Sequence, residues 1–144
     1  MTDRTARKLV DAIYQAMNNR NLDALDKLFT SDYLDHQENR RGVEPLKAQL
    51  RAFFGAFSDL HIEVEDVVAD GDRFASRTTA TGTHDGDLMG LPPTGVRISV
   101  TAVDLGRMEG GRAAERWGGI DMYSLLAQLG AIPQPQSAYG STTR

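Results

Sequence analysis

One carboxylate lies in an otherwise apolar row of side chains. If residues 96–108 form a strand, one of its faces carries Ile98, Val100, Ala102, Asp104, Gly106 and Met108. Burying a carboxylate costs several kcal/mol unless it is paired, hydrogen-bonded or protonated. Apolar surroundings also favour proton exchange by a carboxyl group near neutral pH. Asp104 is therefore a candidate catalytic residue, and the alternative is a structural ion pair with Arg116 on the next strand.

Two further side chains could take or donate a proton. His36 directly follows Asp35 at the exit from the second predicted helix, and a neutral imidazole is a suitable base for a proton next to a carbonyl group. Tyr14 lies on the apolar side of the first predicted helix, where its ring can pack while its hydroxyl faces a cavity. The alternatives are an exposed loop position for His36 and a core-edge position for Tyr14.

The other two histidines, His84 and His61, are weaker candidates for chemistry than His36. His84 ends a predicted strand beside a loop rich in Gly and Pro, so it either holds that loop or contacts a ligand. His61 lies on the charged side of its strand, where we expect it to be solvated. The histidines lack the spacing of a metal site and the chain has no cysteine, so we expect no bound metal.

The last predicted strand and its exit contribute further candidates for substrate contact. Arg116 and Trp117 are neighbours, so one of them faces a cavity and the other points away. Asp121 precedes a short helix, where Asp is a favoured N-cap residue, and ligand contact is its alternative role. Gly118 and Gly119 indicate a bulge or a close approach of backbone or ligand.

The first half of the chain predicts three helices. Apolar residues recur at three- and four-residue spacing in segments 2–18, 22–29 and 43–57, which is typical of amphipathic helices. Pro45 is compatible with the third helix because it falls in the first turn. Residues 30–36 are expected to form the exit from the second helix.

The second half predicts a sheet for these helices to cover. Residues 61–68, 73–84, 96–108 and 113–118 are expected as strands, with turns at 70–72 and 109–112. In the first of them, Ile62, Val64, Asp66 and Val68 are expected to share one side. A last short helix follows Asp121. Helices followed by an antiparallel meander predict an α+β fold, with a curved sheet whose concave face is covered by the N-terminal helices.

Composition narrows the class of protein. The chain has 144 residues, 40% of them apolar and 25% charged, which predicts one domain over residues 1–130 and a flexible tail over 131–144. No apolar run is long enough to span a membrane and no signal peptide is evident, so we expect a cytoplasmic protein. Residues 59–130 carry six basic and twelve acidic side chains. This excess of negative charge disfavours nucleic acid and anionic membranes as partners.

Three segments resemble the SnoaL-like polyketide cyclase (ester cyclase) family. They are the run GTHDGDLMGLPPTG at 82–95, the segment GRAAERW at 111–117 followed by Asp121 and LLAQLG at 125–130, and FTSDYLDH at 29–36. The resemblance implies an NTF2-like cone with a deep apolar pocket, in a homodimer or higher homo-oligomer. It also implies ring closure on polyketides by aldol chemistry, or their hydroxylation, without metal or cofactor.

The sequence departs from this family at two positions. The aldol cyclases of the family place an acid/base aspartate on the last strand and a histidine on the long strand, and the matching residues here are Gly118 and Asp104. Steroid-isomerase relatives combine a tyrosine with two aspartates, for which Tyr14, Asp35 and Asp104 are counterparts. Epoxide-hydrolase relatives need an Asp-Arg-Asp set, and Ala102 and Gly118 stand where two of its members are expected.

These observations predict a cofactor-independent cyclase or isomerase that acts on a hydrophobic polyketide-like substrate by enolisation. We expect His36 or Asp35 as the base, Asp104 as the acid or donor, and Tyr14 as a second donor. The expected substrate contacts are Tyr14, Asp35, His84, Arg116, Trp117 and Asp121. The alternatives are a hydroxylase of an aromatic polyketide and a non-catalytic small-molecule binding protein.

Overall fold

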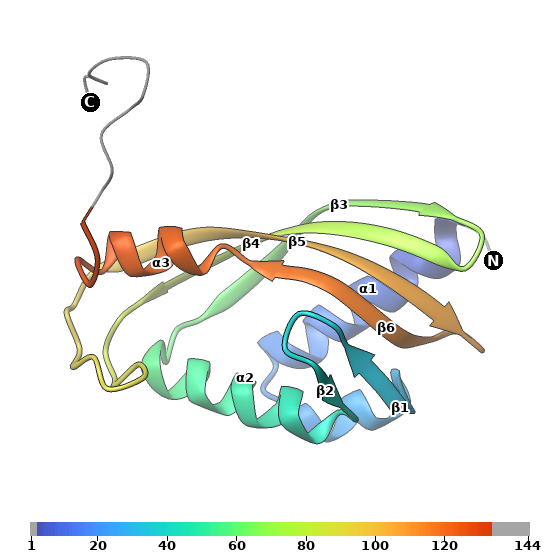
Figure 1. The fold of residues 1–144 in the computed structure, drawn as a ribbon, viewed down its shortest axis with the longest axis horizontal. Coiled ribbons are helices and arrows are strands. Elements are labelled where there is room, and N and C mark those ends of the chain that lie inside the picture. The colour runs from blue at the N-terminus through green and yellow to red at the C-terminus, as the bar shows by residue number, and fades with distance from the viewer. Residues whose placement is uncertain (1–2, 134–144) are drawn as a thin grey trace, which may run out of the picture.

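The computed structural model describes residues 3–133, which form a curved sheet with helices on one face (Figure 1). The elements are α1 (Asp3–Asn18), the 3-10 helix η1 (Leu22–Lys27), β1 (Phe29–Asp35), β2 (Arg40–Arg41), α2 (Glu44–Ala56), β3 (His61–Asp70), β4 (Arg73–Thr83), β5 (Arg97–Glu109), β6 (Arg112–Ile120) and α3 (Met122–Gln128). The strand order is β2-β1-β6-β5-β4-β3. The predicted α+β class is confirmed.

The segment 29–36 differs most from the sequence prediction. Residues 29–35 form strand β1, which pairs with β6 in parallel, whereas the other strand pairs of the described sheet are antiparallel. A register shift between Phe29 and Leu34 breaks the alternation of buried and exposed side chains, so β1 has no regular two-residue pattern. The pairing with β6 joins distant parts of the chain and places Asp35 beside Arg116.

A bulge corrects the predicted facing of β3. The register between β3 and β4 shifts between Val64 and Asp66, and an extra residue reverses the facing of every side chain that follows. Val67 and Ala69 therefore pack against the core, whereas Val68 is 64% exposed. The prediction that Val68 shares the side of Ile62 and Val64 is wrong for this reason.

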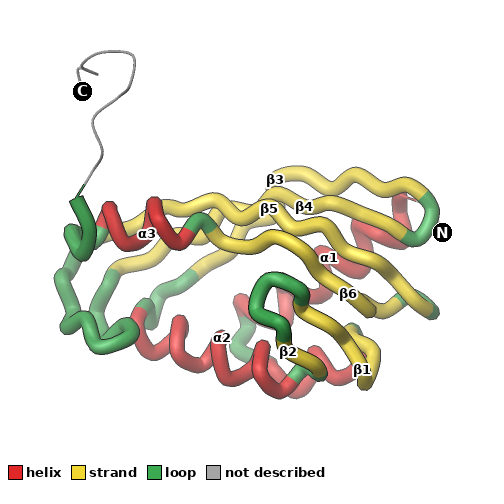
Figure 2. The backbone as a smooth tube through the Cα atoms, in the orientation of Figure 1, coloured by secondary structure: helices red, strands yellow, loops and turns green. Residues whose placement is uncertain are grey.

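Helices α1 and α2 lie along the concave side of the sheet (Figure 2). The apolar stripes of the helices form two packed clusters against the sheet. The first joins α1 to the middle of the sheet and includes Ala6, Leu9, Val10, Ile13, Met17, Phe29, Tyr33, Phe74 and Met108. The second joins the end of α2 to α3 and the start of β5, and includes Phe57, Leu60, Leu88, Ile98, Val100 and Leu125. The periodic residues that predicted the helices are thus the ones that bury them.

The C-terminal end of the domain contains the helix cap that the sequence allows at Asp121. Asp121 caps α3, because its Oδ1 accepts a hydrogen bond of 2.9 Å from the backbone N–H of Ser124. Within residues 3–133, no helix is long and apolar enough to cross a membrane. Most of the predicted tail, residues 134–144, lies outside the described residues, so the domain limits stay a prediction.

Two aspartates hold the loop that joins β4 to β5, and they predict a loss of stability in acid. Ser58 donates to both carboxylate oxygens of Asp85, and Thr83 donates its N–H to Asp59 at 2.7 Å. These hydrogen bonds lower the pKa of Asp85 and of Asp59 below the usual value. The unfolded chain therefore binds more protons below about pH 4, so the free energy of unfolding falls as pH drops through the lowered folded pKa values.

Urea unfolding between pH 7 and pH 3 measures this effect. The Asp85→Asn variant is expected to lose less stability over that range than the wild type, because one of the two linked carboxylates is gone. The control is Asp72→Asn, which removes an exposed carboxylate from the turn between β3 and β4. An identical pH dependence in the wild type and in Asp85→Asn would contradict the assignment.

Candidate active site

A cavity of about 170 Å³ lies between the concave face of the sheet and the two long helices. Most of its lining is apolar, from side chains such as Ile13, Met17, Phe53, Phe74 and Val100. The polar side chains of the lining are Tyr14, Tyr33, Gln49, Ser76, Thr78, Asp104 and Arg116. Glu115 also borders the cavity, although its carboxylate pairs with His36 and Arg107. An apolar cavity with a few polar groups is typical of a small-molecule site.

Arg116 joins two buried carboxylates at the wall of this cavity. Strand β6 lies between β1 and β5, so Arg116 reaches both neighbours. Its Nε donates to Asp104 Oδ1 at 2.6 Å, and its Nη1 donates to Asp35 Oδ2 at 2.9 Å. The side chains of Asp35 and Asp104 are only 6% and 10% exposed. The pairing of Asp104 with Arg116 that the sequence offered as an alternative is therefore present.

The charge of Arg116 is stabilised by its neighbours. Burial opposes the positive charge, but the carboxylates of Asp104 and Asp35, with Tyr33, raise the pKa of Arg116 above its ordinary value. The guanidinium thus remains positively charged between the two carboxylates.

Asp35 is bonded both to Arg116 and to the turn between β1 and β2. Its Oδ1 accepts from the backbone N–H of Gln37 at 3.0 Å and of Glu38 at 3.4 Å, while its Oδ2 accepts from Arg116. Both oxygens are occupied, and Asp35 does not line the cavity in the described part of the chain. It therefore holds the β1–β2 turn and orients Arg116.

Asp104 differs from Asp35 because one of its oxygens is not engaged. Among residues 3–133, Oδ1 is bound by Arg116 and Oδ2 has no hydrogen-bond partner. Asp104 lines the cavity. A carboxylate with one oxygen fixed and one free can exchange a proton with a ligand in that cavity.

Two tyrosine hydroxyls lie close to this carboxylate. Burial and then the negative charge of Asp104 raise the pKa of Tyr14, which is also within hydrogen-bonding reach of Thr78. Burial is likewise the main cause that raises the pKa of Tyr33, which lies beside Arg116. Both phenols stay protonated at neutral pH, so either can donate a hydrogen bond to a ligand oxygen.

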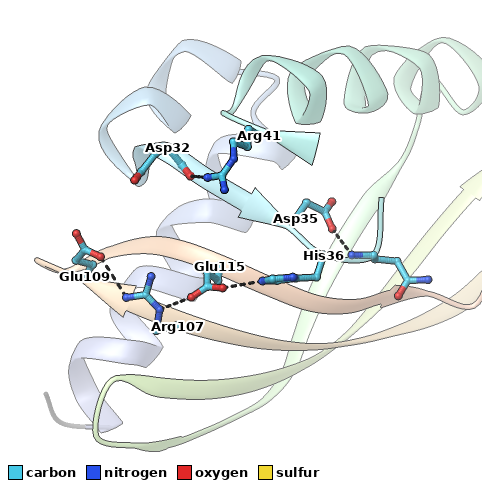
Figure 3. Close-up of polar contacts among 8 residues, drawn as sticks. Asp32, Asp35, His36, Arg41, Arg107, Glu109 and Glu115 are labelled. Atoms are coloured by element: carbon cyan, nitrogen blue, oxygen red, sulfur yellow. Dashed lines mark hydrogen bonds and ion pairs between the residues drawn. The ribbon is translucent and has the colours of Figure 1, made fainter. Parts of the chain in front are cut away.

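His36 and Trp117 lie together on the opposite face of the sheet. Their rings stack with centroids 4.5 Å apart and planes 5° apart, and His36 Nε2 lies 2.6 Å from Glu115 Oε2. Figure 3 shows the polar row formed by Glu109, Arg107, Glu115 and His36. Neither His36 nor Trp117 lines the cavity in the described structure. Of the two neighbours left open by the sequence, Arg116 is the one that faces it.

His84, His61 and Asp121 also lie away from the cavity lining. His84 is fully buried, and its Nδ1 accepts a hydrogen bond of 3.1 Å from the backbone N–H of Thr94. It therefore holds the loop between β4 and β5. His61 is exposed next to Glu63, and Asp121 caps α3. His84 and Asp121 therefore take the structural roles that the sequence offered as alternatives, and His61 is exposed, as expected.

The glycines at the end of β6 permit a close approach of backbone groups. Gly118 has a φ of 99°, and a Cβ there would overlap the backbone carbonyl of Val103. Gly119 has a φ of 145°, and a Cβ there would lie 2.6 Å from Nη2 of Arg116. The position at which the resemblance places the acid/base aspartate thus has no room for a side chain.

Sequence reasoning missed Tyr33 and Gln49 as cavity residues. Tyr33 lies on β1, which was expected as a helix exit. Gln49 is a single polar residue of α2, and nothing in the periodicity distinguishes it from a solvated glutamine. Only the spatial arrangement of α2 opposite β6 makes it a candidate.

The model of the family described as SnoaL-like polyketide cyclase matches residues 7–129. The chain belongs to this family. The match confirms the resemblance and the NTF2-like fold expected from the sequence.

Individual proteins are similar to this chain over most of its length. Aklanonic acid methyl ester cyclase DnrD from Streptomyces peucetius is 27% identical over 128 residues, covering 85% of this chain and 88% of DnrD. The structure of TsrD from Streptomyces laurentii superposes with a TM-score of 0.84 at 28% identity, covering 92% and 99% of the two chains.

Two other similar structures are those of proteins for which an activity is suggested. AclR from Streptomyces galilaeus, a hydroxylase candidate, has a TM-score of 0.83 at 30% identity, covering 96% of this chain and 88% of its own. IdmH from Streptomyces antibioticus, a polyketide cyclase candidate, has a TM-score of 0.76 at 31% identity, covering 87% and 98%. The chain is therefore similar to proteins for which different reactions are suggested.

Proposed function

We propose that the protein is a polyketide cyclase that closes a carbon ring by cofactor-independent aldol chemistry in the apolar cavity. The observation that carries the proposal is Asp104, with one oxygen held by Arg116 and the other free at the cavity wall. The names of DnrD and IdmH support a cyclase over other activities. The substrate class is a hydrophobic polyketide with at least two carbonyl groups.

The reaction can be written with the residues of the cavity. Oδ2 of Asp104 takes a proton from the carbon next to one carbonyl group, and the hydroxyl of Tyr14 donates a hydrogen bond to the resulting enolate oxygen. The enolate carbon then attacks the second carbonyl carbon, which forms the new bond. The proton on Asp104 passes to the alkoxide, so the carboxylate is regenerated. Holding both carbonyls in one cavity removes much of the entropy cost of their encounter.

This assignment moves the role of the base from His36 to Asp104. Asp104 has a free oxygen at the cavity wall, whereas His36 is stacked on Trp117 and does not line the cavity. Asp35 acts as a positioning residue, since it holds Arg116 and not the ligand. If the proton returned to carbon instead of to an alkoxide, the same groups would carry out an isomerisation, which is the close variant of this proposal.

Replacing Asp104 with asparagine tests the assignment. The amide can still accept from Arg116 but cannot take a proton, so turnover is expected to fall at least about tenfold, since general acid–base groups typically contribute 10²–10⁴. The assay substrate is aklanonic acid methyl ester, the compound in the name of DnrD. His36→Asn is the control and is expected to keep wild-type turnover. Wild-type rates in a correctly folded Asp104→Asn variant would remove the proposal.

A hydroxylase is the second candidate, favoured by AclR at a TM-score of 0.83 and by the lack of side-chain space at Gly118. Oxygen consumption separates the two, because an aldol reaction consumes no O₂. An oxygen electrode should record no uptake during turnover. Uptake in proportion to product would favour the hydroxylase.

We further propose a cytoplasmic homodimer that forms through the outer face of the sheet. That face exposes Val68, Val103 and Leu105 by 64%, 55% and 43%, an apolar area that a two-fold contact with a second copy would cover. Light scattering is expected to give twice the chain mass of 15.8 kDa. Val103→Lys should give a monomer, and a monomeric wild type would contradict the proposal.

A further inference from the structure

A second, more polar hollow of about 350 Å³ opens beside the cavity. It is lined by the β1–β2 turn, by the end of β6 and by the start of α3, through Gln37, Glu38, Gly118, Gly119 and Met122 among others. Gln49, Arg116 and Ile120 line both the hollow and the cavity. These three residues therefore lie at the boundary between the apolar cavity and the outer hollow.

The amide of Gln49 has a fixed orientation at this boundary. Nη2 of Arg40 donates a hydrogen bond of 2.8 Å to the Gln49 side-chain oxygen. A guanidinium has only donors, so the group that faces Arg40 must be the oxygen and not the NH₂. Nε2 of Gln49 has no acceptor among residues 3–133, and it is therefore free to donate to a ligand.

Arg116 offers a second donor at the same boundary. Its Nε and Nη1 are used by Asp104 and Asp35, and the Tyr33 hydroxyl also lies within hydrogen-bonding reach of the guanidinium, while neither carboxylate is bonded to Nη2. Gly119 permits this arrangement, because a Cβ there would lie 2.6 Å from Nη2. The pair of glycines thus leaves one edge of the guanidinium uncovered.

The charges around these donors disfavour an anionic partner. Arg116 and Arg40 contribute two positive charges, whereas Asp35, Asp104 and Glu38 contribute three negative ones, which leaves an excess of one negative charge. A carboxylate or phosphate would be repelled by this excess. A neutral carbonyl oxygen has two lone pairs, so it can accept from both donors without adding charge.

We propose that Gln49 and Arg116 form a subsite for a neutral carbonyl oxygen of a ligand whose apolar part fills the cavity. The inference rests on the proposed function, because it takes the cavity as the ligand site. It makes Gln49 a specificity-determining residue, which selects a ketone or ester over a hydrocarbon and over a free acid of the same shape.

Three naphthalenes of nearly equal shape test this subsite by equilibrium dialysis at pH 7. They carry acetyl, isopropyl or carboxylate groups at the same ring position. The wild type is expected to bind the acetyl probe at least about tenfold more tightly than the carboxylate. Gln49→Glu keeps an acceptor for Arg40 but replaces the donor with an acceptor. This substitution should weaken the binding of the acetyl probe about tenfold and the binding of the isopropyl probe by less than about twofold.

The control is Gln15→Glu, the same chemical change on the exposed side of α1, which should alter neither affinity. Equal losses for the acetyl and isopropyl probes in Gln49→Glu would overturn the subsite, because Gln49 would then act only on the shape of the cavity. An unchanged affinity of Gln49→Glu for the acetyl probe would also overturn the subsite. In that case the proposed function stays intact if the isopropyl probe binds. Failure of every probe to bind the wild type would overturn the cavity as a ligand site and the proposed function with it.

Discussion

Replacing Arg116 with methionine is expected to lower the free energy of unfolding by about 3–5 kcal/mol. Methionine is apolar and has no charge to offer, so Asp35 and Asp104 would remain buried with no cation between them. Removing one partner of a buried ion pair is costly because the remaining charge has lost both water and its counter-ion. Here a single cation pairs with two carboxylates, so the expected loss of stability lies at the upper end of the range measured for point substitutions.

Urea unfolding at pH 7 measures this loss, and Arg107→Met is the matched control. Arg107 also pairs with two carboxylates, Glu109 and Glu115, but on the outer face of the sheet, where we expect a cost of about 1 kcal/mol or less. Adding Asp35→Asn and Asp104→Asn to the Arg116→Met variant should recover much of the stability. Equal, small losses in Arg116→Met and Arg107→Met would show that the buried network contributes little.

Introducing an aspartate at Gly118, where the resemblance places the acid/base residue of the aldol cyclases, is expected to damage the fold and not to add activity. Gly118 has a φ of 99°, and a Cβ there would overlap the carbonyl of Val103. A side chain in such a backbone conformation costs about 1–3 kcal/mol, and the overlap adds to this. We therefore expect Gly118→Asp to lower the free energy of unfolding by about 3 kcal/mol or more.

Gly110→Asp is the control for Gly118→Asp. Gly110 also has a positive φ, of 59°, but no atom lies within 4 Å of the Cβ position, so the cost there should be about 1–2 kcal/mol. Urea unfolding and turnover are measured for both variants. A Gly118→Asp variant as stable as the wild type, or one with raised turnover, would show that the strand can open and that the position is usable for catalysis.

The sequence predicts the fold well where the signal is local. The three- and four-residue spacing of α1 and α2 and the alternation in β5 each depend on neighbouring residues, and these elements lie close to their expected positions. The parallel pairing of β1 with β6 depends on residues far apart in the chain, so no local pattern indicates it. The bulge in β3 likewise escapes a parity argument, because one extra residue reverses every later side chain.

The difference between local patterns and contacts between distant residues also explains which site residues could be predicted. Asp104 and Arg116 lie on neighbouring strands of a predictable meander, and their pairing was anticipated as one alternative. Asp35 joins them only because β1 exists. After the register shift in β1, Asp35 pairs with Arg116. The next residue, His36, points the other way, which accounts for the stacking of His36 on Trp117 outside the cavity.

A crystal structure with the compound used in the turnover assay tests the central claim, that the free oxygen of Asp104 meets the ligand in the apolar cavity. We expect the ring system of the ligand between α1, α2 and the sheet, with a ligand atom within about 3.2 Å of Asp104 Oδ2. A ligand stacked on His36 and Trp117 at the outer face, with the cavity empty, would contradict the account.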